Sequence, residues 1–256
     1  MSRDKHNVVV TAAGRSVGRV MAERFLARGD AVHICDIDER LLNDVLGSNP
    51  GLGGTLCDVA DEAQVARLFA EARARMGPID VLVNTVGIAG PRGPIESLSF
   101  ADWRATMAAN LDSMFLTIRA AVPDMRRNRS GTIVNFSTGS TKTVMPFRSP
   151  YVASKAGVEG LTRALARELG PDNIRINAIL PGMIDNERMQ GVLQRIADQE
   201  GRSVEEVERT ALQYISMRTK IQPADIADMV LFLCSSAACR VTGQLISVDG
   251  NVEWEE

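Results

Sequence analysis

The amino-acid sequence predicts a doubly wound α/β domain in which helices cover both faces of a parallel sheet of about seven strands. Short apolar runs rich in β-branched residues alternate with longer segments whose apolar residues recur every three or four positions. Most of the short runs are continuously apolar, which is typical of strands buried on both faces. The length of 256 residues fits one large α/β domain, and we predict a single domain over 1–256.

The predicted strands are each bounded by glycine, proline, aspartate or asparagine. They comprise residues 7–12, 31–36, 54–59, 79–86, 131–138, 174–180 and 244–249.

Helical periodicity is clearest at 17–28 and 61–76, and another helix is expected at 223–236. Asp61 is the expected N-cap of the second of these helices, which ends at Gly77. A polar, helix-prone insertion at about 185–222 is predicted to form a lid over the substrate. The alternative is a solvated helical hairpin that only packs against its surroundings.

The net charge, the lengths of the apolar runs and the cysteine spacing argue against several classes of protein. The net charge is -3 and no basic cluster dominates, which argues against nucleic-acid binding. No apolar run is long enough to span a bilayer, and the polar first residues predict no signal peptide. The cysteines form no CxxC pair, so we expect free thiols in a cytoplasmic protein and no metal site. These cysteines are Cys35, Cys57, Cys234 and Cys239.

The first predicted strand ends in the segment TAAGRSVGR, residues 11–19. A glycine-containing turn between a strand and a helix lets the backbone approach a pyrophosphate, whose charge the helix N-terminus favours. Asp36 ends the second predicted strand, 18 residues after Gly18. A carboxylate at that place is suited to hydrogen-bond the adenine ribose hydroxyls. The sequence therefore predicts a dinucleotide site.

A tyrosine and a lysine are four residues apart in RSPYVASKAG, residues 148–157. In a helix, Tyr151 and Lys155 lie on one face. A neighbouring ammonium favours the phenolate and lowers the pKa of a phenol from about 10. The pair therefore predicts a tyrosine that moves a proton, although an ordinary half-buried helix would also fit this stretch alone.

Together these motifs resemble the short-chain dehydrogenase/reductase family over essentially the whole chain, which implies a Rossmann fold. The family loop is usually TGxxxGxG. In this chain Ala12 and Ser16 stand at the first and second glycine positions, and Gly18 keeps the third. We expect Ala12 to be a mild change. Ser16 is expected to be a larger one, with its hydroxyl donating to a phosphate oxygen.

The resemblance also implies the cofactor and its contacts. Arg15 resembles the basic residue of NADP-using members, whereas Asp36 resembles the acid of NAD-using members and Ile37 replaces their frequent arginine. Because Asp36 would repel a 2′-phosphate, the expected cofactor is NAD, with NADP less favoured. The cofactor-binding residues so implied are Ala13, Arg15, Ser16, Val17, Gly18, Asp36, Ile37, Asp58, Val59, Asn84, Val86, Gly87, Tyr151, Lys155, Pro181, Gly182, Ile184 and Asn186; of these, Asn84 is expected mainly to stabilise the sheet.

The same resemblance assigns the catalytic roles. Tyr151 is the implied general acid/base, Lys155 lowers its pKa, and Asn110 holds a water that links Lys155 to solvent. Thr138 takes the place of the family's serine, thirteen residues before the tyrosine, and its hydroxyl can still polarise a carbonyl oxygen. The expected substrate-pocket residues are Ser140, Arg148, Met183 and Arg188. Arg92 and Lys142 are expected nearby, and these cations either meet an anionic substrate or are only surface charge.

The leading hypothesis is an oxidoreductase that transfers a hydride between NAD(H) and a secondary alcohol or ketone. The substrate is left open among small polar metabolites, polyols, cyclic alcohols and 3-oxoacyl thioesters. The alternatives are a non-catalytic dinucleotide-binding regulatory or assembly protein and, within the enzyme class, an NADP-dependent 3-oxoacyl reductase. The resemblance further implies a homotetramer or dimer built on long helices at about 100–128 and 150–169. Trp254 is expected at a subunit interface or over the pocket.

Overall fold

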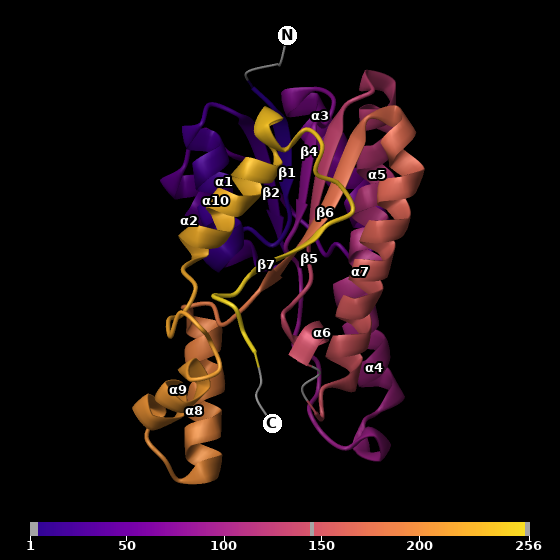
Figure 1. The fold of residues 1–256 in the computed structure, drawn as a ribbon. Coiled ribbons are helices and arrows are strands. Elements are labelled where there is room, and N and C mark those ends of the chain that lie inside the picture. The colour runs from indigo at the N-terminus through magenta and orange to yellow at the C-terminus, as the bar shows by residue number, and fades with distance from the viewer. Residues whose placement is uncertain (1–4, 144–145, 254–256) are drawn as a thin grey trace.

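A parallel sheet forms the centre of the molecule (Figure 1). The computed structural model describes residues 5–143 and 146–253, and within them seven strands pair in the order β3-β2-β1-β4-β5-β6-β7. Every strand pair is parallel. The strands are β1 (Asn7–Val10), β2 (Ala31–Asp36), β3 (Gly53–Leu56), β4 (Val81–Asn84), β5 (Gly131–Phe136), β6 (Ile174–Pro181) and β7 (Leu245–Val248).

All seven predicted strands are confirmed, but five of the predicted runs continue past the observed carboxyl end of the strand. Several of the extra residues are apolar because they line a cavity beyond the sheet edge rather than pack within the sheet. These are Ala12, Cys57, Val59 and Val86.

Two layers of helices enclose the sheet (Figure 1). α1 (Ser16–Ala27), α2 (Glu39–Ser48) and α10 (Pro223–Leu233) cover one face. α3 (Glu62–Met76), α5 (Ser113–Asn128) and α7 (Ser149–Leu169) cover the other. In β1, Val8 and Val10 belong to the core beneath the first layer and Val9 to the core beneath the second. Both faces of the strand are therefore apolar, which explains the continuous run.

The predicted caps of α3 are confirmed. The Asp61 carboxylate accepts a hydrogen bond from the Gln64 backbone at 3.0 Å, and Gly77 ends the helix with a φ of 89°. An N-cap of this kind satisfies a backbone donor that the helix itself leaves unpaired.

The long helix expected at 100–128 is not one regular helix. α4 (Phe100–Met107) passes into a π-helical turn at Ala108–Asp112 before α5 begins. The wider turn holds Asn110, whose side chain pairs with the backbone of Ile88. Single π turns of this kind are frequent at functional sites. The helix expected at 150–169 is confirmed as α7.

The insertion at 185–222 forms α8 (Glu187–Glu200) and α9 (Val204–Leu212), which pack on each other through Leu193, Ala197 and Val207. The pair extends beyond the carboxyl edge of the sheet (Figure 1). At its base, Lys220 forms ion pairs with Asp185 and Glu208. Short helical segments complete the described chain: Ile95–Ser97, α6 (Ser140–Thr143), Gly170–Asp172 and Ser236–Ala238.

None of the helices in the described ranges combines the length and apolar character needed to cross a membrane. Trp254 lies outside the described residues.

Candidate active site

Lys155 lies at the carboxyl ends of the central strands β4 and β5. Its Nζ donates to the carbonyl of Phe136 at 2.7 Å and to that of Val86 at 3.4 Å. Tyr151 precedes it by one turn of α7, and both side chains are buried. The predicted pair therefore occupies the edge of the sheet where parallel α/β proteins bind their ligands.

Burial and, to a smaller extent, the positive charge of Arg188 together lower the pKa of the Lys155 ammonium to about 7. A neutral lysine is thus accessible near physiological pH. Gly87 allows the close approach of this side chain, because a Cβ at that position would lie 3.0 Å from Nζ.

Asn110 ties three segments of the site together. Its Oδ1 accepts from the Ile88 backbone at 2.7 Å, and its Nδ2 donates to the Ile88 carbonyl at 3.0 Å and to Ser154 Oγ at 2.9 Å. Ser154 in turn donates to the carbonyl of Tyr151 at 2.8 Å. Sequence reasoning missed Ser154; its signal was a small polar residue placed between Tyr151 and Lys155.

The hydroxyls at 137, 138 and 140 point to different places. Ser137 donates to the Lys155 carbonyl and to Glu159, so its hydroxyl is directed into α7. Thr138 and Ser140 lie within hydrogen-bond distance of each other, with 3.3 Å between Thr138 Oγ1 and Ser140 Oγ. The geometry thus distinguishes Ser137, whose hydroxyl bonds to α7, from the paired hydroxyls of Thr138 and Ser140.

A cavity of about 130 Å³ opens beyond the carboxyl ends of β1, β2 and β4, where the order of strands changes direction between β1 and β4. Five predicted cofactor residues line it: Asp36, Ile37, Asp58, Val59 and Val86. Six lining residues were not predicted for this role: Ala12, Cys35, Cys57, Ala60, Ile88 and Ala109. Most of these follow or end a strand, and that position is the signal that could have identified them.

Asp36 is held firmly at this cavity. One carboxylate oxygen accepts from the Gly14 backbone at 2.9 Å and the other from the Asp38 backbone at 3.0 Å. The apolar walls, the fixed carboxylate and the adjoining N-terminus of α1 suit an adenosine with a neighbouring pyrophosphate. The residues present therefore fit a dinucleotide.

The loop before α1 adopts the conformation that glycines usually provide. Ala12 has a φ of 48° and Ser16 a φ of 51°, both in the left-handed region. The expectation that Ala12 is a mild change is therefore wrong with respect to backbone strain. Gly18 is required by close packing, since a Cβ there would lie 2.4 Å from the Ala12 carbonyl oxygen.

The side chains of two predicted cofactor residues, Asn84 and Asn186, have structural roles. Asn84 is 1% exposed and bonds to Asn135 and Thr117, so its side chain supports the sheet, as expected. Asn186 caps α8 and donates to Ser16 Oγ at 3.0 Å, which ties the insertion to the phosphate loop.

The other predicted cofactor residues lie in the loop before α1 and in the segment after β6. Ala13 and Val17 are buried beneath the loop, and Arg15 is exposed. Beyond β6, Gly182 donates to the Val248 carbonyl, and Ile221 donates to the Met183 carbonyl at 2.8 Å. Pro181 ends β6 and Ile184 bridges to Ile221, so this segment lies along the carboxyl edge.

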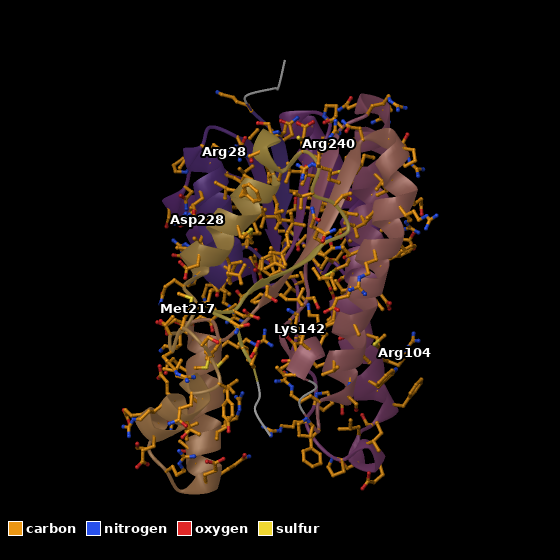
Figure 2. The ribbon with its side chains drawn as sticks, viewed as in Figure 1. Arg28, Arg104, Lys142, Met217, Asp228 and Arg240 are labelled. Carbon is orange, nitrogen blue, oxygen red and sulfur yellow. The ribbon has the colours of Figure 1, made fainter. Side chains whose placement is uncertain are left out.

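The expected cations do not all face the same way. Lys142, labelled in Figure 2, projects from α6 and donates to Ser247 Oγ at 2.5 Å. Arg148 occupies the N-cap position of α7, and its guanidinium carbon lies 4.5 Å from the centre of the Tyr151 ring. No group of three or more histidine, cysteine, aspartate or glutamate side chains suited to a metal ion occurs in the described part of the chain.

The fold and this site define a nicotinamide-dependent oxidoreductase. Residues 11–252 match the family model described as enoyl-(acyl carrier protein) reductase. The chain belongs to the short-chain dehydrogenase/reductase family, and it acts on hydroxyl and keto groups. The non-catalytic alternative is not favoured.

Three relatives illustrate the similarity. The chain is 32% identical to the 3-oxoacyl-[acyl-carrier-protein] reductase FabG of Thermotoga maritima, covering 95% of this chain and 96% of that protein. A variant of actinorhodin polyketide ketoreductase with NADPH is similar with a TM-score of 0.90 at 30% identity, covering 95% of each chain. The 7α-hydroxysteroid dehydrogenase complexed with NADH and 7-oxo glycochenodeoxycholic acid is similar with a TM-score of 0.88 at 31% identity. The match covers 97% of this chain and 94% of the other.

Proposed function

We propose that the protein transfers a hydride between NAD(H) and a secondary alcohol or ketone, with Tyr151 as the general acid/base. The observation that carries this proposal is the buried Lys155, fixed between β4 and β5 one turn away from Tyr151. A buried lysine without a carboxylate partner costs stability, and a role in moving a proton accounts for it.

The chain's own residues have distinct roles. Tyr151 gives a proton to the substrate oxygen in reduction and takes it in oxidation. Lys155 stabilises the phenolate by its charge and exchanges its proton with solvent through a water held at Asn110. Thr138 donates to the substrate oxygen, and Ser140 positions the Thr138 hydroxyl. The nicotinamide, when bound, supplies or accepts the hydride.

The preference for NAD rests on Asp36. Its carboxylate is fixed by two backbone donors at the rim of the adenosine cavity, so it cannot turn away from a 2′-phosphate. Repulsion between these charges in a partly buried site disfavours NADP. Ile37 beside it supplies no compensating cation.

A second candidate is an NADP-dependent 3-oxoacyl reductase. The exposed Arg15, which immediately precedes α1, supports it because a guanidinium there could pair with a 2′-phosphate. The similarity to FabG agrees with this candidate. A fixed Asp36 argues against it.

We also infer the setting of the enzyme. Helices α8 and α9 act as the lid, supported by the hydrogen bond between Asn186 and Ser16 that joins them to the cofactor loop. A cytoplasmic location agrees with the free thiols of the described cysteines. A homo-oligomer, a dimer or tetramer, is supported by an apolar groove of about 380 Å³ between α5 and α7.

Titration of the purified protein with NADH and with NADPH, followed by nicotinamide fluorescence, tests the cofactor assignment. We expect NADH to bind at least about tenfold more tightly, and Asp36→Asn to reduce that ratio. A preference for NADPH would favour the second candidate. Binding of neither nucleotide would contradict both.

A further inference from the structure

Arg148 lies against the ring of Tyr151, and the charges of two further arginines from separate parts of the chain, Arg92 and Arg188, act on it. Arg92 is in the loop after β4, Arg148 begins α7, and Arg188 is in the first turn of α8. Burial lowers the pKa of Arg148 most, the neighbouring Tyr151 raises it, and the charges of Arg188 and Arg92 lower it by less. The charge of Arg188 also lowers the pKa of Lys155, so it acts on both Arg148 and the buried lysine.

Arg148 is half-buried and its guanidinium donates to the Ala89 carbonyl at 3.5 Å, whereas Arg92 and Arg188 are exposed. The Gly93 backbone donates to the Phe147 carbonyl at 3.1 Å, which joins the residues next to Arg92 and Arg148. The Arg148 guanidinium lies over the Tyr151 ring, at 4.5 Å from its centre. Arg188 follows the Asn186 cap that is bonded to the phosphate loop. The fold therefore positions the Arg148 guanidinium, the backbone beside Arg92 and the start of the helix that carries Arg188.

No carboxylate neutralises this cluster. None of the ion pairs formed within residues 5–143 and 146–253 includes any of the three arginines. Elsewhere, Arg28 and Arg73 pair with buried aspartates. Like charges gathered near a buried lysine repel one another, and an anion bound among them would relieve that repulsion.

We propose that the substrate carries an anionic oxyacid group, which Arg148 and Arg188 bind beside Tyr151. The guanidinium fork matches the oxygens of a carboxylate, a sulfonate or a phosphate. Because Arg148 lies on the ring of the proton-transferring tyrosine, the anionic group is only a few bonds from the carbon that is oxidised or reduced. The substrate is thus a short oxo or hydroxy acid rather than a neutral polyol or cyclic alcohol. This rests on the oxidoreductase function proposed above.

Calorimetry on the enzyme–NAD⁺ complex tests the proposal without turnover, since a ketone cannot react with the oxidised cofactor. The probes are acetoacetate, 2-oxopropanesulfonate, hydroxyacetone phosphate and the neutral acetoacetamide. We expect at least one anionic ketone to bind at least about tenfold more tightly than acetoacetamide. Which of the three binds best identifies the acid class.

Variants assign the effect to residues. Arg148→Gln and Arg188→Gln are each expected to remove most of the preference for the anion, and Arg148→Lys to restore part of it. Arg163→Gln, an exposed arginine on the same helix as Arg148, is the matched control and keeps the preference. NADH affinity is measured for each variant.

Two results would overturn the anion site: binding of acetoacetamide equal to that of all three anions, or a preference that survives in both glutamine variants. The same conclusion follows if NADH binds but no ketone does. If Arg188→Gln weakens NADH and leaves the anion preference intact, Arg188 serves the cofactor and not the substrate. Failure of the wild-type protein to bind NADH would instead contradict the proposed function. It would also contradict the anion site, which rests on that function.

Discussion

Lys155 has an unusual environment for a lysine, because it is 3% exposed and its hydrogen bonds go to backbone carbonyls. Burial lowers its pKa to about 7 in the folded protein, whereas an unfolded lysine titrates near 10.4. Between these values the unfolded state binds the extra proton. Stability contributed through Lys155 therefore increases as the pH rises from about 7 to about 10.4.

This pH dependence can be measured against a variant without the ionisable group. We expect the free energy of unfolding of the wild type to rise relative to that of Lys155→Met over this range, by up to a few kcal/mol. Denaturant unfolding of both proteins at several pH values gives the difference, in which the other titrating groups cancel. Parallel curves would show that Lys155 keeps its ordinary pKa.

The hydroxyls around residue 138 differ in direction, so their removal has different consequences. Thr138→Ala is expected to lower kcat/KM about 100-fold through loss of a donor to the substrate oxygen. Ser137→Ala is expected to lower stability by about 1 kcal/mol through its lost bonds to α7, with a much smaller effect on turnover. Steady-state kinetics and thermal unfolding on the three alanine variants, including Ser140→Ala, separate these effects. If only Ser137→Ala abolished turnover, the assigned position would be wrong.

Among the elements, the loop before α1 departs most from the family's TGxxxGxG pattern. Ala12 and Ser16 both have left-handed backbone angles, which cost an ordinary residue roughly 1–2 kcal/mol. The hydrogen bond from Asn186 to Ser16 fixes the loop from the side of the insertion. The departures thus place backbone strain in the loop at Ala12 and Ser16.

Relief of that strain is testable. Ala12→Gly is expected to raise the free energy of unfolding by about 0.5 kcal/mol, since the relief exceeds the entropy that glycine adds to the unfolded chain. Ala13→Gly is the control and is expected to destabilise the protein by about 1 kcal/mol, because Ala13 is buried and has no left-handed angle. Equal destabilisation in both variants would show that Ala12 is not strained.

Some features of the helices and strands could be predicted from the sequence, and others could not. Buried strands and capped helices were predictable because burial and capping leave local patterns, as in β1 and at Asp61. The π turn at Asn110 was not predictable, since its cause is pairing with Ile88, which is distant in sequence. Likewise, the spacing to Tyr151 selected Thr138, but only the structure shows that the Ser137 hydroxyl is directed into α7. The arginine cluster depends on three separate segments.

At the scale of the whole molecule, an apolar groove lies on the outer side of α5 and α7, away from the sheet. Phe115, Val122, Leu161 and Leu165 line it, and Phe115 is 50% exposed. Exposed apolar surface of this kind marks an interaction site, and a second copy of the chain is the proposed partner. The partner would then brace α5, which follows the π turn at Asn110, and α7, which carries Tyr151.

Phe115→Glu is expected to convert the oligomer to smaller species, because it places a charge in the proposed interface. Phe100→Glu, at an exposed phenylalanine of α4 outside the groove, is the control. Sedimentation velocity distinguishes the two variants. Sedimentation of the wild-type protein only as a monomer would contradict the proposed interface.

The comparison of wild type with Tyr151→Phe, using nicotinamide fluorescence for NADH binding and steady-state kinetics for turnover, tests the central proposal most directly. The substitution removes one hydroxyl and keeps the ring beneath Arg148. We expect NADH affinity to stay within about threefold and kcat to fall by at least about 100-fold, because the proton can no longer be transferred. Turnover that persists at a comparable rate would show that another group carries the proton.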